Sequence, residues 1–572
     1  MTITNEKINK KERKFYSSNL KADSVELVTK ELELLNEVTI NSKQDLETFI
    51  HKVSEFVFII YETYAWKYIK MTCNADKPEN AKAFNDFFAN IMTKLQAYSF
   101  KFNKKIYESA YKSELPTEEY AHLMKIVANE IELFREENIP LNVKENELAN
   151  KYGEMFSKLT VNFDGEDKTL IQMRQYQKSN DRKVREKAWR LVAERIMKES
   201  DEFNELFDEL KKLRIQITKN VGFENYRDYM HQEKGRFDYT PQDIIEFHKS
   251  VEQVVVPFLK ELSEDRKEKL KVNSLRPWDV SVDLDGKILK PFSSENEFVD
   301  KAVKILSKVK PEFGKNLNMM KNSGFLDLEN RKGKAPGGYN FPLAEYGAAF
   351  IFMNAIGLQS DVSTLLHESG HAMHSFATAD MKIAQYGNTP SEIAELASMS
   401  MELLTLDYLD EYYDNKEDLI KAKKEQLEGT LKFLPWCMIV DAFQQWIYTE
   451  PNHTAAERTQ YFKSLMDRFN VGIDWSGLLS EKGSQWLRQL HIFEVPFYYI
   501  EYGISQLGAI AVYKNYKENG KVAIKQYEDF LKLGYSKSVK ELYKAAGIKF
   551  DFSVDYIKGI VEFIKEELAL LK

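Results

Sequence analysis

The chain has 572 residues, of which 43% are hydrophobic and 30% charged, and its formal net charge is −8. This composition is typical of a globular protein that is large enough for several domains. The 89 acidic residues outnumber the 81 basic ones, so no basic excess is available for phosphates, which argues against a general nucleic-acid-binding protein.

Two cysteines, Cys73 and Cys437, are too few for a disulfide framework, and this scarcity favours a cytoplasmic setting. The N-terminal sequence lacks the apolar stretch of a secretory signal, and the longest apolar runs are too short to span a bilayer. We therefore expect a cytoplasmic protein without membrane contact. The basic run KINKKERK, residues 7–14, is expected to be a solvated chain end.

Apolar residues recur at intervals of three and four through most of the chain, which predicts a mainly α-helical fold. Residues 42–72 are expected to form one long helix with Ser42 as its cap. Residues 181–220 are expected to form a pair of long amphipathic helices, because their apolar positions do not keep the strict heptad of a coiled coil.

The middle of the chain departs from the helical pattern. Residues 278–292 alternate around Asp285-Gly286, which predicts a β-hairpin. Residues 324–357 contain β-rich runs broken by Gly and Pro, which predict a small sheet. The last of these runs, residues 348–355, stands just before a histidine-rich helix and is expected to form a wall beside it.

That helix contains TLLHESGHAMHSF, Thr364 to Phe376, with Ser360 and Asp361 as cap and first-turn acid. His367 and His371 are one helical turn apart, so both imidazoles can reach one ion. Glu368 lies about 100° further around the helix, where it can contact a water as general base and proton shuttle. Two imidazoles and a carboxylate are ligands that suit zinc.

The third ligand has to come from another segment. One zinc-protease pattern places a third histidine after the second, but Ala377 occupies that position here. A helix predicted to start at Thr389-Pro390-Ser391 carries Glu395 and Glu402 on one face. If this helix crosses the first, it delivers Glu395 to the metal, while Glu402 or Glu392 can orient an imidazole.

The segments HESGHAMHSF and SEIAELASMSMELL resemble the metal-binding core of the thimet oligopeptidase and oligoendopeptidase F family, and most closely its oligoendopeptidase F and Pz-peptidase branch. The resemblance extends over APGGYNF and HIFEVPFYYIEYGISQLGA, and so over residues 181–509. It implies one Zn²⁺ per chain on His367, His371 and Glu395, with His374 and Glu402 as supporting residues around the ligands.

The resemblance also implies a mainly α fold, with two helical lobes forming an ellipsoid around a deep substrate channel and a small β-sheet beside the zinc helix. The expected domains are an N-terminal helical lobe, residues 1–200, and a catalytic metallopeptidase domain, residues 201–572. A deep channel would admit short unfolded peptides and exclude folded proteins.

Near the C-terminus, Pro496 is predicted to lie in the first turn of a helix that stacks Tyr498 and Tyr502 one turn apart. Family members use a histidine and tyrosines of this segment on the tetrahedral intermediate. A stripe of aromatic side chains packed in a core would be the ordinary explanation of such a tyrosine pair. The resemblance instead assigns the role to His491 and Tyr502 first, Tyr499 next and Tyr498 last, although the spacing does not separate the last two.

An extended peptide substrate needs backbone partners, which an exposed strand edge supplies. We expect residues 348–355 to provide this edge and two glycines to permit close approach, although an ordinary tight turn would explain the glycines equally well. The expected substrate-binding residues are Gly337, Gly338, Tyr339, Ala349 and Phe350.

The sequence thus predicts a zinc-dependent oligoendopeptidase, a hydrolase that cleaves internal bonds of short unstructured peptides with Glu368 as general base. A dipeptidyl carboxypeptidase or carboxypeptidase could use the same zinc core, but no pattern identifies a group that grips a C-terminal carboxylate. A non-catalytic zinc-containing peptide-binding protein would not need Glu368. Oligopeptides, and neither nucleic acid nor membrane, are the expected partners of a monomer or homodimer.

Overall fold

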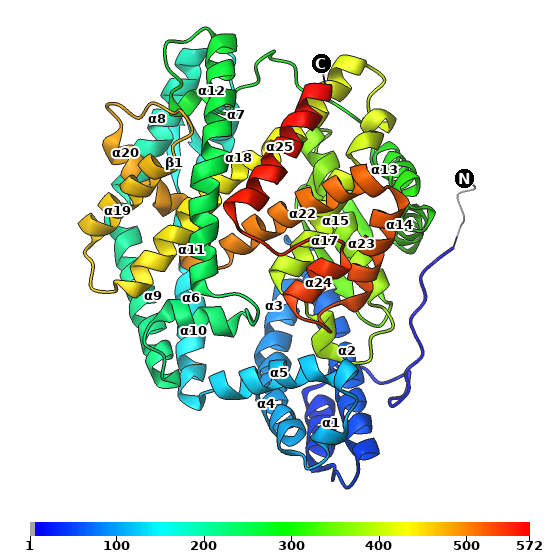
Figure 1. The fold of residues 1–572 in the computed structure, drawn as a ribbon. Coiled ribbons are helices and arrows are strands. Elements are labelled where there is room, and N and C mark those ends of the chain that lie inside the picture. The colour runs from blue at the N-terminus through cyan, green and yellow to red at the C-terminus, as the bar shows by residue number, and fades with distance from the viewer. Residues whose placement is uncertain (1–5, 572) are drawn as a thin grey trace. The chain divides into compact units, whose positions relative to one another are not determined.

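The computed structural model describes residues 6–571, and its chain is mainly α-helical with small sheets, as predicted (Figure 1). The chain divides into two compact units, each assembled from three segments. Unit 1 consists of residues 6–133, 289–423 and 508–550, and unit 2 consists of residues 134–288, 424–507 and 551–571. These compact units are not defined in the same way as the two predicted domains, so the predicted domain boundary at residue 200 stays a prediction.

Unit 1 contains two groups of helices and a three-stranded sheet. Its elements before the sheet are α1 (Val25–Glu37), α2 (Lys43–Cys73), α3 (Pro78–Phe87), α4 (Thr93–Glu108), α5 (Thr117–Leu133), α13 (Glu295–Val309) and α14 (Pro311–Ser323). The sheet and the later elements are β3 (Leu326–Glu329), β4 (Tyr339–Leu343), β5 (Ala348–Ala355), α15 (Gln359–Ala377), α16 (Ala384–Gly387), α17 (Ser391–Leu404), α23 (Lys521–Leu533) and α24 (Val539–Ala545).

Unit 2 is helical apart from one short hairpin. Its elements are α6 (Ile139–Ser157), β1 (Thr160–Phe163), β2 (Glu166–Thr169), α7 (Leu170–Gln177), α8 (Arg182–Lys198), α9 (Ser200–Val221), α10 (Tyr226–Glu233), α11 (Pro241–Ser250), α12 (Val256–Leu270), α19 (Ala455–Arg468), α20 (Leu479–Gly483), α21 (Leu490–Glu494) and α25 (Val554–Leu570). Two further helices, α18 (Lys416–Thr449) and α22 (Tyr499–Asn519), contain residues of both units.

The long helices predicted from periodicity are confirmed. Helix α2 begins after Ser42, whose side chain accepts a hydrogen bond from Asp45 N–H and so satisfies a free donor of the first turn. The pair expected in residues 181–220 is present as α8 and α9, and Gly222 in a left-handed conformation ends the second. In residues 6–571 no helix is both long and apolar enough to cross a membrane.

The predicted small sheet is present, with strand order β3-β5-β4. The expectation that residues 348–355 form an exposed edge is wrong. Strand β5 is the central strand, parallel to β3 and antiparallel to β4, and Ala349 and Phe350 are 0% and 5% exposed. A run that is apolar on both faces is typical of such a covered strand, whereas an edge strand tolerates a proline, as β4 does at Pro342.

The hairpin predicted around Asp285-Gly286 is also wrong, because residues 281–293 form no strand. Only part of the alternating pattern is buried: Val282 is 3% exposed, while Ile288 is 66% exposed. A side chain supplies the backbone partners that a second strand would have supplied, since the Arg266 guanidinium donates to the carbonyls of Asp279 and Val282.

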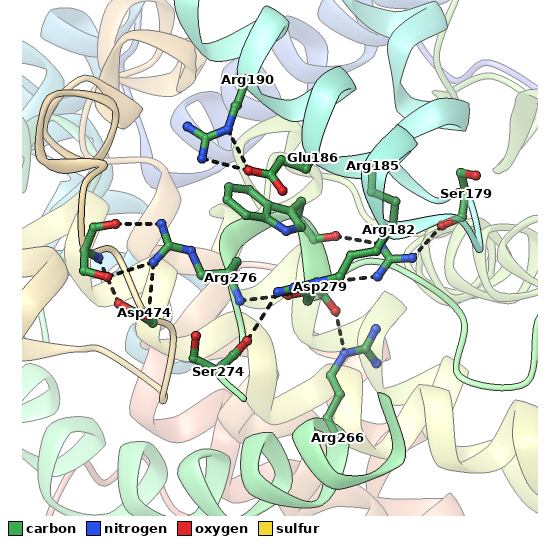
Figure 2. Close-up of polar contacts among 12 residues, drawn as sticks. Ser179, Arg182, Arg185, Glu186, Arg190, Arg266, Ser274, Arg276, Asp279 and Asp474 are labelled. Atoms are coloured by element: carbon green, nitrogen blue, oxygen red, sulfur yellow. Dashed lines mark hydrogen bonds and ion pairs between the residues drawn. The ribbon is translucent and has the colours of Figure 1, made fainter. Parts of the chain in front are cut away.

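The buried carboxylate of Asp279 fixes the irregular segment of residues 274–280, which precedes residues 281–293 (Figure 2). Asp279 is 0% exposed and accepts hydrogen bonds from the guanidinium groups of Arg182 and Arg185 on α8, and from the Arg276 backbone N–H. These bonds hold the pKa of the Asp279 carboxyl below its usual range, although burial opposes them. Residues without a regular backbone ladder are thus tied to a helix by charge-assisted hydrogen bonds.

The basic run at the N-terminus is not a solvated end in the part that the structure describes. Arg13 and Lys10 pair with Glu345 at 2.5 and 2.7 Å, and the Lys11 N–H donates to the Glu345 carbonyl at 2.8 Å. Glu345 is 8% exposed and lies in the turn that joins β4 to β5. The extended segment of residues 8–16 therefore anchors the β4–β5 turn.

We expect Arg13→Met to lower the free energy of unfolding by about 2 kcal/mol, because it leaves the buried Glu345 carboxylate with one largely exposed partner, Lys10. Urea denaturation measures the change. The control is Lys82→Met, which breaks an exposed ion pair with Asp86 and should cost less than about 0.5 kcal/mol. Equal losses in the two variants would show that the N-terminal segment contributes no anchoring.

Candidate metal centre

Helix α15 carries the histidine motif, and its sequence explains both its start and its neighbour. The Asp361 carboxylate in the first turn accepts hydrogen bonds from the N–H groups of Ile356 and Leu358 at 2.8 Å, which ties the preceding loop to the helix. The helix begins after Leu358, so the expectation that Ser360 is its cap is wrong. At Gly370 a Cβ atom would lie 2.6 Å from Ser398 Cα and 2.7 Å from the Ala397 carbonyl oxygen on α17. A glycine is therefore required for the close crossing of α15 and α17, both in unit 1 (Figure 1).

This crossing brings together the three residues that were predicted as metal ligands, His367, His371 and Glu395. Glu395 Oε2 lies 3.3 Å from His367 Nε2 and 3.8 Å from His371 Nε2. One ligand atom from each residue lies within 4.8 Å of the others, and no other group of three such side chains does so in residues 6–571. The imidazoles are about one-fifth exposed, so the site is reachable from solvent.

The donor set fits a zinc ion. Ligands at about 2.0–2.2 Å around a tetrahedral ion are separated by about 3.4 Å, close to the two measured distances. Burial, followed by the charge of His367, lowers the pKa of His371 to about 3, which keeps its imidazole neutral as a ligand must be. Two imidazoles and one carboxylate leave a fourth position open, which is typical of catalytic rather than structural zinc.

His367 faces a different carboxylate with each ring nitrogen. Its Nδ1 lies 2.7 Å from Glu402 Oε1, on the side of the ring away from Glu395. Although burial opposes the effect, hydrogen bonds to Glu395 and Glu402 raise the pKa of His367 well above its usual value. Without an ion the imidazole is therefore protonated at both nitrogens; an ion would displace the Nε2 proton, while Nδ1–H would keep its hydrogen bond to Glu402.

Glu368 lies on the same helix and is 7% exposed. Burial raises the pKa of its carboxyl to about 7; the charge of His367 opposes this shift, and Glu395 and Glu402 add to it. A divalent cation at the histidines would lower this pKa again. Only without an ion would this carboxyl group gain and lose a proton near neutral pH; with an ion bound it would be a carboxylate, the form that can accept a proton.

His374, the further histidine of the motif, is placed differently. It is 6% exposed, its ring lies 5.9 Å from that of Phe530, and its Nε2 has no hydrogen-bond partner among the described residues. Burial lowers its pKa to about 4, so it is a neutral side chain in an apolar setting. Unlike Glu402, it makes no hydrogen bond to a ligand.

Residues 335–341, APGGYNF, which we call the glycine loop, lie next to α15, and its glycines serve the turn and the packing. Gly337 has φ +97°, which favours glycine, and a Cβ there would meet nothing within 4 Å. A Cβ at Gly338 would lie 3.4 Å from the Phe352 carbonyl oxygen. The Tyr339 hydroxyl is hydrogen-bonded to Thr72 Oγ1 at 2.6 Å, and its ring stacks on Phe352.

The sheet edge beside α15 belongs to β4. The Ile351 N–H donates to the Phe325 carbonyl, so the backbone groups of Ile351 point toward β3 and not toward its partner Asn340 on β4. The backbone groups of the neighbouring residues of β5 point toward β4, where they pair with Tyr339, Phe341 and Leu343. The N–H and C=O of Asn340 consequently point away from the sheet. The Asn340 side chain donates to the Glu368 carbonyl at 3.1 Å, which fixes this edge against α15.

In unit 2 the predicted histidine and tyrosines form one aromatic cluster. Ring centroids of His491 lie 4.7, 6.1 and 6.2 Å from those of Tyr499, Tyr502 and Tyr498. Gln489 Nε2 lies 2.7 Å from His491 Nδ1, and burial lowers the pKa of His491 to about 4. Helix α22 begins at Tyr499 rather than at Pro496, and Tyr498 precedes it.

Two buried arginines hold the backbone on either side of the link between α21 and α22. Arg214, 0% exposed, donates to the carbonyls of Ile492 and Phe493, and Arg236, 4% exposed, donates to the Phe497 carbonyl at 2.6 Å. Phe497 has φ +61°, which costs a non-glycine residue about 1–2 kcal/mol. Sequence reasoning did not find these arginines, because no local pattern marks a buried cation that binds distant carbonyls.

A pair of histidines on one helix and a glutamate from a crossing helix, with a carboxylate next to the first histidine, are the features of a metallopeptidase site. The chain belongs to peptidase family M3, because the pattern of that family matches residues 175–562 and the pattern of the M3 N-terminal domain matches residues 15–134.

Similar proteins confirm the predicted oligoendopeptidase F branch. A solved structure of PZ peptidase A with an inhibitor is 27% identical with a TM-score of 0.87, covering 97% of this chain and 99% of that one. Oligopeptidase PepF of Bacillus subtilis is 26% identical over 48% of this chain and 40% of its own length. Group B oligopeptidase PepB of Streptococcus agalactiae is 22% identical over 88% of this chain and 86% of its own. The chain also matches only 52% of the length of oligoendopeptidase F of Lactococcus lactis and 57% of that of an oligoendopeptidase F homolog of Mycoplasma genitalium. It thus spans about half the length of these two relatives.

Proposed function

We propose that this chain is a zinc-dependent oligoendopeptidase that hydrolyses internal bonds of short unstructured peptides. The observation that carries the proposal is the convergence of His367 Nε2, His371 Nε2 and Glu395 Oε2, with Glu368 on the same helix. Membership of family M3, and the names of relatives such as oligopeptidase PepF, support the reaction class.

His367, His371 and Glu395 would hold the ion, which when bound would supply Lewis acidity to polarise a peptide carbonyl and acidify a water. The Glu368 carboxylate then takes a proton from the attacking water and gives it to the nitrogen of the leaving amine. Glu402 holds the His367 ring through Nδ1. No covalent bond between enzyme and substrate is needed, and neither cysteine takes part.

The free edge of β4 is the proposed support for the substrate backbone. The outward N–H and C=O of Asn340 can pair with an extended peptide in the manner of an added strand. His491 and Tyr502, with Tyr499 or Tyr498, are proposed as donors to the negative charge that develops on the scissile carbonyl oxygen, an assignment taken from the family. One well-placed donor is worth about 10²–10³-fold in kcat.

Unstructured peptides of about 6 to 30 residues, incubated with the purified protein and mapped by mass spectrometry, test the function. We expect internal cuts that fade as the peptides lengthen and that a metal chelator abolishes until Zn²⁺ is restored. Stepwise loss from the C-terminus would instead identify a carboxypeptidase. Bound metal without any cleavage would leave the peptide-binding alternative.

A further inference from the structure

We propose that Arg236, together with Gln444, is a positioning residue that holds Phe497 in its left-handed conformation and thereby places the tyrosines of the 498–502 segment. This inference rests on the proposed function, because it acts through the tyrosines that are assigned to the scissile carbonyl. All of the residues concerned lie in unit 2.

Both backbone groups of Phe497 are held by buried side chains. Its N–H donates to Gln444 Oε1 on α18 at 2.8 Å, and its carbonyl accepts from Arg236 Nη2 at 2.6 Å. Gln444 is 0% exposed and Phe497 1% exposed, so water does not compete for these bonds. A strained residue persists only where its surroundings fix it from more than one side, and here two elements do so.

Arg236 also connects this strained turn to the helix that follows it. The same Nη2 atom lies 2.7 Å from Glu501 Oε1, and the side chain of Glu501 is 3% exposed. Glu501 stands between Tyr499 and Tyr502 on the first turn of α22. One nitrogen of the guanidinium therefore ties the residue before the tyrosines to a residue among them.

The turn that carries Arg236 contacts a tyrosine directly. Lys234, two residues earlier, places its ammonium group 5.4 Å from the Tyr498 ring centroid. The left-handed residue Phe497 lies between His491 and α22, where the ring of Tyr499 lies 4.7 Å from that of His491. If Phe497 relaxes to an ordinary conformation, Tyr498, Tyr499 and Tyr502 change direction together.

The test uses Arg236→Met, the milder Arg236→Lys, and Gln444→Met, which removes the acceptor for Phe497 N–H at similar volume. The matched control is Arg185→Met. Arg185 is another buried arginine of unit 2 that binds one carboxylate and several carbonyls, but it belongs to the Asp279 network, far from the tyrosines in sequence (Figure 2).

We expect Arg236→Met to lower kcat by about 10²-fold with KM changed less than about threefold, and Arg236→Lys to be intermediate. The affinity for a phosphinic peptide, which mimics the tetrahedral carbon, should fall by a similar factor, while the affinity for a simple hydroxamate stays within about twofold. Backbone hydrogen exchange of residues 490–502 should accelerate in the Arg236 and Gln444 variants and not in Arg185→Met. A loss that equals the control's, or unchanged phosphinate affinity, would overturn the proposal.

Tyr502→Phe separates this proposal from the one on which it rests. If Arg236 acts through the tyrosines, the double variant Arg236→Met/Tyr502→Phe loses less than the product of the two single losses. If the losses in kcat multiply in the double variant, the positioning role of Arg236 is overturned and the role of the tyrosines is not. The same follows if Tyr502→Phe is impaired while Arg236→Met is fully active. Full activity of Tyr502→Phe and of His491→Ala would overturn the assignment of this segment and the positioning role with it.

Discussion

Glu368→Gln is expected to lower kcat by about 10³-fold while the protein keeps its bound metal. The glutamine has the same shape but cannot accept a proton from water at neutral pH, and general base catalysis is worth about 10²–10⁴-fold. Because Glu368 is not one of the three residues whose ligand atoms converge, metal affinity should change little. Peptide cleavage rates and zinc content of the same preparation measure both quantities.

The control for this variant is Asp361→Asn on the same helix. Asp361 ties the loop before α15 to its first turn through two backbone N–H groups, so its loss should reduce stability by about 1 kcal/mol and leave kcat within about twofold. Glu368→Asp should fall between the two, about 10²-fold below the parent, because its carboxylate is withdrawn by one methylene. A Glu368→Gln enzyme that retains more than a tenth of the activity would exclude Glu368 as the base.

The convergence of three side chains could be anticipated from the sequence because two of them are linked by local geometry, although their role as metal ligands stays a prediction. Helical spacing alone places His367 and His371 on one face, and the position of Glu395 on a second helix follows once α15 and α17 cross. The crossing itself is encoded at Gly370, where any side chain would collide with α17. Helices such as α2 could be predicted for the same reason, because the cap residue and the spacing of apolar residues that indicate a helix lie within one or two turns of each other.

The features that the sequence did not predict depend on contacts between distant residues. The central place of β5 depends on a parallel partner, β3, and an apolar run does not say which of its edges is paired. The anchoring of Arg13 depends on Glu345, and the turn at Phe497 depends on Arg236 and Gln444. None of these pairs has a spacing that a periodic pattern could reveal.

Buried cations that donate to carbonyls are a common means by which this chain fixes irregular segments. Arg185 does so beside Asp279, Arg214 and Arg236 beside His491 and Phe497, and Lys334 next to the glycine loop, where its ammonium group donates to Asp327, Glu329 and Met353. Backbone without a ladder must find partners when it is buried, and one long side chain can serve several carbonyls at once. The segments held in this way include two that we assign to the substrate.

Glu395→Gln is expected to abolish zinc binding at concentrations where the parent is saturated, whereas Glu402→Gln is expected to weaken it by about 10–100-fold. Glu395 approaches Nε2 of both histidines, so it can share an ion with them. Glu402 approaches only Nδ1 of His367, on the other side of the ring, and can act only on the orientation and tautomer of that imidazole. Competition with a chromogenic chelator measures both affinities.

Glu392→Gln is the control. Glu392 is a buried glutamate near the start of the same helix α17, and it is Glu402, not Glu392, that lies at His367 Nδ1, so this change should leave zinc affinity within about twofold. If Glu402→Gln lost zinc as fully as Glu395→Gln, Glu402 would be a ligand and the His367 ring would have to turn over to bring Nδ1 to the ion. Glu402 would then be the ligand, and Glu395 would orient the imidazole. The sequence motif allows both arrangements, and the measurement of zinc affinity distinguishes them. With the predicted order of affinities, the ligand set is His367, His371 and Glu395, and Glu402 fixes the ring that the ion requires.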